Sequence, residues 1–165
     1  ATVKAAIANK EILTDYQKRF FKSALSKAET GKVRGYVFGD ESDVTRTNAF
    51  LDKLLLHRVN VYILARNQTI NGITYHAGKS YVVPTKQPQY RMVQSAFETY
   101  SEYTDSVYYD ASAWSLANFY NIPYAASSTF QNGEEVKTIE QIVNTPERSA
   151  YAYIMPWNDY NAPAA

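Results

Sequence analysis

The sequence predicts an α/β fold with a parallel-rich sheet. Two apolar runs, 33–39 and 59–65, have the length and composition of buried strands. Between them, residues 44–57 repeat their apolar side chains with helical spacing. A strand, a helix and a second strand in close succession form the crossover unit that joins parallel strands. This pattern is the main indication of the fold class.

The composition excludes several classes of partner and chemistry. The chain has 165 residues, 45% of them hydrophobic, which suits one domain with or without an extension. Its net charge of +1 and its scattered basic residues predict no nucleic-acid partner. No run approaches the roughly 18 apolar residues of a membrane span, so no membrane partner is expected. The absence of cysteine removes disulfides, thiolate zinc sites and cysteine nucleophiles.

The N-terminal region predicts one amphipathic helix, from Glu11 to Ala28, with Gly31 as its stop. Its apolar side chains recur every four residues, at Ile12, Tyr16, Phe20, Ala24 and Ala28. The opposite face is polar, and the helix stands apart from the strand that follows. We therefore expect residues 1–31 to be a connector to a domain outside this chain, and residues 32–165 to form the α/β domain.

Further elements follow from turn and periodicity signals. Asn71-Gly72 predicts a β-hairpin turn. Beyond it we expect a strand at 80–83, helices at 89–100 and 108–120, and a strand at 149–155, while 134–143 fits either a helix or a strand. Asn161-Ala162-Pro163 has the pattern of a helix start, which predicts that the natural chain continues and is truncated here.

The sequence carries no complete active site. A zinc site needs about three or four ligands at defined spacing, and the two histidines, His57 and His76, lack a nearby carboxylate in any short metal motif. We expect His57 at a helix C-terminus, where the dipole favours a positive ring. No Gly-x-Ser-x-Gly elbow is present, and Gly35 to Gly39 lacks the third glycine of a dinucleotide loop. We therefore predict no catalytic, cofactor-binding or metal-binding residue.

One polar cluster, formed by Asp40, Ser42 and Asp43, follows the first predicted strand. Open α/β sheets bind ligands at such strand ends. The alternative is that these side chains only cap the following helix. Both interpretations remain open from the sequence.

The 15 tyrosines are unusually many, and nine of them lie between Tyr75 and Tyr124. A tyrosine presents an apolar ring with a polar tip, which suits half-buried positions. The segment 81–124 is therefore a candidate interdomain or substrate-facing surface. The alternatives are packing at the edge of the core and a stacking platform for a sugar or peptide.

Three motifs carry a family resemblance: Gly78 to Pro84 followed by Gln87 to Arg91, Tyr109 to Trp114, and Ala150 to Ile154. Together they resemble the region that follows the peptidase domain in large bacterial zinc carboxypeptidases of the carboxypeptidase A type. That region is similar to class I glutamine amidotransferases. The resemblance covers residues 32–165 and implies a three-layer, flavodoxin-like α/β fold. It also implies an extracellular or periplasmic location and places residues 11–28 at the junction with the peptidase.

The resemblance brings no active site to this chain. The peptidase family binds zinc through His-x-x-Glu and a later histidine, which neither histidine here matches, and an amidotransferase needs a cysteine nucleophile. The implied function is a non-catalytic accessory domain of a secreted zinc metallocarboxypeptidase. Its partner would be its own peptidase domain, and zinc is expected only there.

Two alternatives remain beside the accessory domain. One is a free-standing carbohydrate- or peptide-binding module that uses the Tyr-rich surface. The other is an independent enzyme with a serine or carboxylate site that no motif reveals. The candidate ligand or interface residues are Asp40, Ser42, Asp43, Tyr90, Arg91, Asp110 and Trp114.

Overall fold

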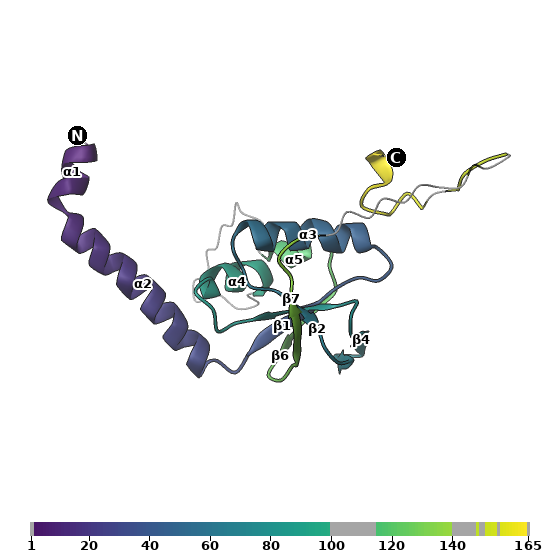
Figure 1. Cartoon of the computed structure of the whole chain (residues 1–165), viewed down its shortest axis with the longest axis horizontal. Helices are drawn as coiled ribbons and strands as arrows, with labels where there is room; N and C mark the ends of the chain where they lie inside the picture. The colour runs from purple at the N-terminus through teal and green to yellow at the C-terminus, as the bar shows by residue number, and fades with distance from the viewer. Residues whose placement is uncertain (1, 100–114, 140–147, 149–150, 155, 165) are drawn as a thin grey trace, which may run out of the picture.

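The computed structural model describes residues 2–99, 115–139, 148, 151–154 and 156–164 (Figure 1). A long N-terminal helical arm leads into a sheet that helices cover on one face and a hairpin covers on the other. The elements are α1 (Thr2–Ala8), α2 (Lys10–Thr30), β1 (Gly35–Phe38), α3 (Val44–Leu56), β2 (Tyr62–Leu64), β3 (Gln68–Ile70), β4 (Ile73–Tyr75), β5 (Tyr81–Pro84), α4 (Tyr90–Phe97), α5 (Leu116–Phe119), β6 (Tyr124–Ser127), β7 (Asn132–Glu135) and the 3-10 helix η1 (Ala162–Ala164).

The five-stranded sheet has the order β6-β1-β5-β2-β7, and every neighbouring pair is antiparallel. β1 and β2 do run in the same direction, but β5 lies between them and pairs with both, through Tyr36↔Val83 and Tyr62↔Val82. The unit is therefore a split crossover. β1-α3-β2-β5-α4-α5-β6 has the βαββαβ arrangement of ferredoxin-like folds, with β7 added beside β2.

The predicted parallel-rich, three-layer flavodoxin-like sheet is wrong. The strand–helix–strand pattern does predict the crossover, because β1, α3 and β2 all form. It carries no information about a later strand that inserts between the first two. The fold that the resemblance to amidotransferase-like domains implied is overturned by the same antiparallel pairings.

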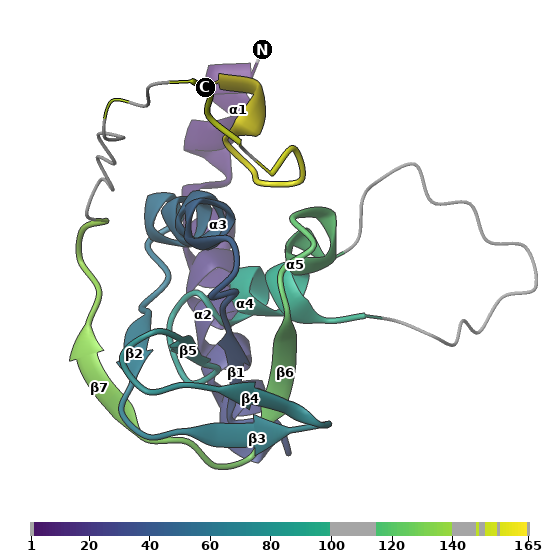
Figure 2. The same cartoon turned by 90° about the vertical axis from the view of Figure 1, so that its right-hand side faces the viewer.

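The main core lies between the sheet and helices α3, α4 and α5 (Figure 2). Phe38 of β1 meets Phe50 of α3 edge to face, with ring centroids 5.2 Å apart. Phe97 of α4 contacts Phe50 in the same way at 5.5 Å and stacks on Tyr36 at 4.8 Å. These aromatic contacts fix the helices on the sheet.

The opposite face of the sheet is covered by the β3–β4 hairpin (Figure 2). Tyr75 of β4 packs on Val37 and Val82, which alternate with the residues of the main core. The predicted turn is confirmed: Asn71 and Gly72 both have positive φ, 53° and 81°, as a type I′ turn requires. Because the helices cover one face of β1 and the hairpin covers the other, β1 is buried on both faces. Its continuous apolar run is therefore explained without a parallel sheet.

The helix predicted at 11–28 is confirmed as α2, and the Gly31 amide closes it by donating to the Lys27 carbonyl at 3.0 Å. Only Ala24 and Ala28 of this helix are buried. Its C-terminal part contacts α4, whereas its N-terminal part and α1 project away from the sheet (Figure 1).

Other predicted elements have mixed outcomes. The helix expected at 89–100 is present as α4. Of the helix expected at 108–120, the described part contains the single turn α5, and residues 108–114 lie outside the described residues. The open choice at 134–143 resolves as a strand at its start, β7. The strand expected at 149–155 is wrong at 151–154, where the described residues form a bend and irregular structure.

Candidate functional site

The polar residues after β1 form a tight turn that leads into α3. Ser42 donates to Asp40 Oδ1 from its amide at 2.9 Å and from its hydroxyl at 2.6 Å. Asp43 Oδ1 accepts from the Arg46 amide at 2.8 Å and from the Thr45 hydroxyl at 2.7 Å. Asp43 is therefore the N-cap of α3, and the helix-cap interpretation of this residue is confirmed.

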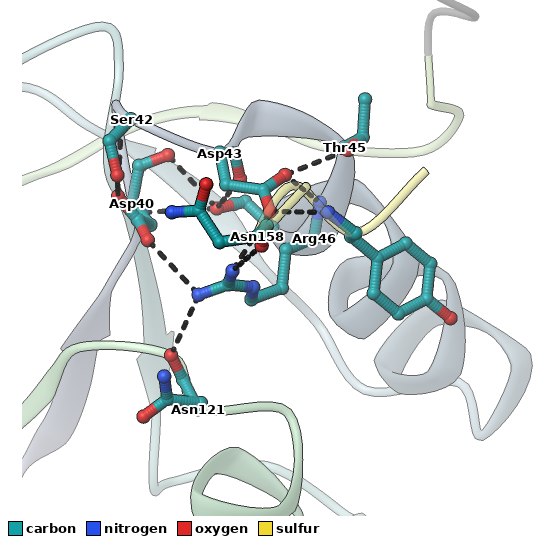
Figure 3. Close-up of polar contacts among 9 residues, drawn as sticks. Asp40, Ser42, Asp43, Thr45, Arg46, Asn121 and Asn158 are labelled. Carbon is teal, nitrogen blue, oxygen red and sulfur yellow. Dashed lines mark hydrogen bonds and ion pairs between the residues drawn. The ribbon is translucent and has the colours of Figure 1, made fainter. Parts of the chain in front are cut away.

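Arg46, which the sequence analysis missed, ties this turn to two distant parts of the chain (Figure 3). Its guanidinium lies 3.0 Å from Asp43 Oδ2 and 3.6 Å from Asp40 Oδ2. It also donates to the carbonyl of Asn121, at 3.5 Å, and to that of Asn158, at 3.0 Å. Since no local pattern marks contacts 75 and 112 residues away, no sequence signal could have identified this role.

The second carboxylate oxygen of Asp43 accepts from the Tyr160 amide at 2.7 Å. Burial alone would raise the pKa of Asp43. The hydrogen bonds from Arg46, Thr45 and Tyr160, together with the Arg46 charge, outweigh burial and hold this pKa below its usual range. The site therefore stabilises the ionised form of Asp43 through groups of the chain itself. A general acid or base works best when its pKa lies near the operating pH, so this environment does not favour acid–base catalysis by Asp43.

Tyr90 and Arg91 lie at the start of α4. The Arg91 guanidinium carbon is 4.7 Å from the centre of the Phe20 ring, and Arg91 Nη2 donates to Ser23 Oγ at 3.1 Å. Arg91 thus holds α2 against α4, an interface within the chain. Asp110 and Trp114 lie outside the described residues.

The two histidines occupy different structural positions. His57 caps the C-terminus of α3, as predicted. His76 Nδ1 contacts Glu41 Oε1 on the surface, and Glu41 Oε2 accepts from Lys79 Nζ at 2.8 Å. Lys79 first and His76 second lower the pKa of Glu41. Within the described ranges, no three His, Cys, Asp or Glu side chains gather in a way that could hold a metal ion.

The tyrosines of the segment 81–124 do not form an open aromatic platform in its described part. Tyr81, Tyr120 and Tyr124 are partly buried and pack on the main core. A groove of about 630 Å³ does lie between α3 and residues 134–139. It is lined by Val44, Asn48, Leu51, Ile63, Tyr81, Glu134, Glu135, Val136, Lys137, Thr138 and Ile139.

A set of large apolar side chains on α1 and the N-terminal half of α2 is exposed. We call it the arm surface; it consists of Val3, Ile7, Ile12, Leu13 and Tyr16. Ile12 and Tyr16 are 65% and 64% exposed, although they belong to the stripe that predicted the helix. Exposed apolar side chains that gather on neighbouring helices are typical of contact surfaces for another protein or domain.

Among the described residues, no helix combines the length and the apolar character needed to cross a membrane. Comparisons of the chain with family models, with curated proteins and with solved structures found no match.

Proposed function

We propose that this chain is a non-catalytic accessory domain that packs, through the arm surface, on the peptidase domain of a zinc carboxypeptidase of the carboxypeptidase A type. The observation that carries the proposal is the exposure of Ile12, Leu13 and Tyr16 on a helix that is otherwise well formed. A contact there would support the peptidase or shape access to its substrate.

Burial of the arm surface would give such a contact its driving force. Covering a large aliphatic or aromatic side chain contributes about 1.5–3 kcal/mol relative to leaving it exposed. A helix that extends from a domain also gains little stability by itself, because most helical stability in proteins comes from packing of the apolar face. A partner along α1 and α2 would supply that packing.

The polar cluster supports an accessory role over a catalytic one. Arg46, Thr45 and Tyr160 occupy both carboxylate oxygens of Asp43. Asp40 is likewise engaged by Ser42 and lies near Arg46. The polar residues that suggested a ligand site after β1 therefore make hydrogen bonds and ion pairs within the chain.

The motifs that resemble the carboxypeptidase family have a structural reason in this chain. Ser80, Thr85 and Gln87 are buried polar residues. The Gln87 side chain accepts from the Asn60 amide at 2.7 Å and donates to the Pro84 carbonyl at 2.7 Å. The motif from Gly78 to Arg91 therefore encodes the junction of β5 with α4.

The test is to recover the coding sequence on both sides of this segment. We expect one open reading frame in which a His-x-x-Glu motif and a later histidine precede Ala1. Deletion of residues 1–165 from that protein should then lower its thermal stability or change its substrate range. An open reading frame without the zinc motif, or a deletion that changes neither property, would contradict the proposal.

A free-standing binding module is the second candidate, and the groove between α3 and residues 134–139 is the observation that favours it. Its lining combines apolar side chains with the charged side chains of Glu134, Glu135 and Lys137, as in many sites for small molecules or peptides. In the described part of the segment 81–124, Tyr81, Tyr120 and Tyr124 pack on the core and supply no open stacking surface for this candidate.

A further inference from the structure

The segment 156–164 contacts Asp43 and Arg46 at the start of α3 (Figure 3) and Tyr120 at the end of α5, all of them far from it in sequence. Two of its contacts are made by main-chain groups: the Asn158 carbonyl accepts from Arg46 at 3.0 Å, and the Tyr160 amide donates to Asp43 at 2.7 Å. A third is aromatic, since the Tyr160 ring stacks on Tyr120 with centroids 6.1 Å apart.

These contacts are those of peptide recognition. Asp43 accepts the main-chain N–H of Tyr160, Arg46 donates to the carbonyl two residues earlier, and Tyr120 stacks on the ring of Tyr160 itself. A charged acceptor and a charged donor make stronger hydrogen bonds than neutral groups do. Main-chain contacts provide affinity, while the ring contact selects an aromatic residue.

We propose that Asp43, Arg46 and Tyr120 form a peptide-binding site, and that the segment 156–164 is its intramolecular ligand, a clasp that exchanges with free peptides of the same chemistry. The required ligand is a short peptide with an aromatic residue at the position of Tyr160 and an accessible carbonyl two residues before it. The inference does not depend on the peptidase partner proposed above.

The packing of the clasp fits a replaceable ligand. Among the described residues, the segment joins no strand of the sheet, and the Asp159 and Ala162 amides donate within it, to the carbonyls of Pro156 and Asp159. Trp157 is 73% exposed and Tyr160 is 48% exposed, whereas Ala162 is buried. A segment outside the sheet whose large side chains are mostly exposed opens locally more easily than the core does. Because the segment belongs to the same chain as the site, its effective concentration is higher than that of a free peptide, which keeps the site filled.

The test uses the whole chain and a fluorescent peptide of residues 156–164. The substitution Tyr160→Pro removes the main-chain donor to Asp43 and should release the clasp. Fluorescence anisotropy should then show the labelled peptide binding at least about 10-fold more tightly to the Tyr160→Pro chain than to the unmodified chain, because the tethered segment no longer competes. A peptide that itself carries Tyr160→Pro should not bind.

A second substitution identifies the site. Adding Arg46→Met to the Tyr160→Pro chain should abolish peptide binding, while circular dichroism should still report a folded domain. If the labelled peptide binds neither chain, or binds both equally well, the proposal is overturned.

Hydrogen exchange of the unmodified chain gives a test that needs no variant. The amide of Tyr160 should exchange through local opening, faster than the amide of Leu64, which donates to Ser80 within the sheet at 2.8 Å. The two rates should respond differently to low concentrations of urea. Equal rates with equal urea dependence would mean that the clasp leaves only on global unfolding, which also overturns the proposal.

Discussion

The helices α2 and α3 carry comparable apolar stripes and have opposite surroundings. On α3, Phe50 and Leu54 are fully buried against the sheet. On the N-terminal half of α2, Ile12 and Tyr16 remain mostly exposed. An amphipathic stripe predicts that a helix has a face to cover, and it leaves open whether the cover comes from the same domain. The difference between the two helices is what leads us to propose a partner for the arm surface.

The largest effect is expected from a substitution in the buried face of α3. Phe50 touches Phe38, Phe97 and Tyr120, so Phe50→Ala leaves a cavity at the centre of the main core. The free energy of unfolding, from urea denaturation, should fall by about 3–5 kcal/mol. A loss below about 1 kcal/mol would mean that the core is not closed as described.

The next effect concerns Arg46, whose side chain bridges Asp40 and Asp43 and two main-chain carbonyls. Arg46→Met keeps much of the volume and leaves Asp43, which is 5% exposed, without its cation. We expect a loss of about 1–3 kcal/mol in the free energy of unfolding. Arg58→Met provides a matched control on a residue outside this cluster, and equal losses in the two variants would argue against the cluster.

Acid should weaken the same cluster. The folded-state pKa of Asp43 is held below its usual range, so the charged side chain contributes stability above the unfolded-state pKa of about 3.9. That contribution is lost as the pH falls through the lower folded-state pKa. Asp43→Asn keeps a capping residue without the charge. Its urea midpoint should lie below that of the unmodified chain at pH 6, and the gap should narrow at pH 3; a constant gap would contradict the assignment.

Arg91 tests where the α2 helix is anchored. Arg91→Ala removes the cation over Phe20 and the hydrogen bond to Ser23, and exposed cation–π contacts contribute about 0.5–1 kcal/mol. We expect faster amide exchange in the C-terminal half of α2 with little change in the β1 and β5 amides. Unchanged exchange throughout α2 would show that Ala24 and Ala28 alone hold this helix.

The smallest effect is expected on the arm surface. The double substitution Leu13→Gln and Tyr16→Gln should change the stability of the isolated chain by less than about 0.5 kcal/mol, because exposed side chains contribute little there. The same pair should weaken association with a partner that covers the arm. A large loss of stability in the isolated chain would mean that these side chains pack within it.

Local signals in the sequence predict α2, α3, α4 and the hairpin, but neither α1 nor the short length of α5. The stripe from Ile12 to Ala28, the cap Asp43 and the turn Asn71-Gly72 each act through near neighbours, and α2, α3 and β3–β4 form accordingly. Such local signals could not predict the order of the strands in the sheet. The insertion of β5 between β1 and β2 depends on pairing between residues far apart, and an apolar run is equally compatible with a parallel strand or an antiparallel strand covered on both faces.

The same difference between local and long-range contacts applies to the candidate site. Asp43 could be predicted as a cap, because an N-cap is read from one residue and its helix. Arg46 could not, since its partners Asn121 and Asn158 reach it only through the tertiary fold. Arg91 is a candidate ligand or interface residue in the sequence, and the contact that the structure describes is with α2. Nothing in the sequence near Tyr160 signals its bond to Asp43.

The measurement that tests the central claim most directly is hydrogen exchange along α1 and α2, compared between the isolated chain and the same chain extended upstream by its native coding sequence. We predict fast exchange at residues 3–16 in the isolated chain and rates slowed at least about 10-fold in the extended protein, which corresponds to about 1.4 kcal/mol of added protection. The amides of β1 and β5 should change little. Equal rates at residues 3–16 in the two proteins would contradict the claim that a neighbouring domain covers the arm surface.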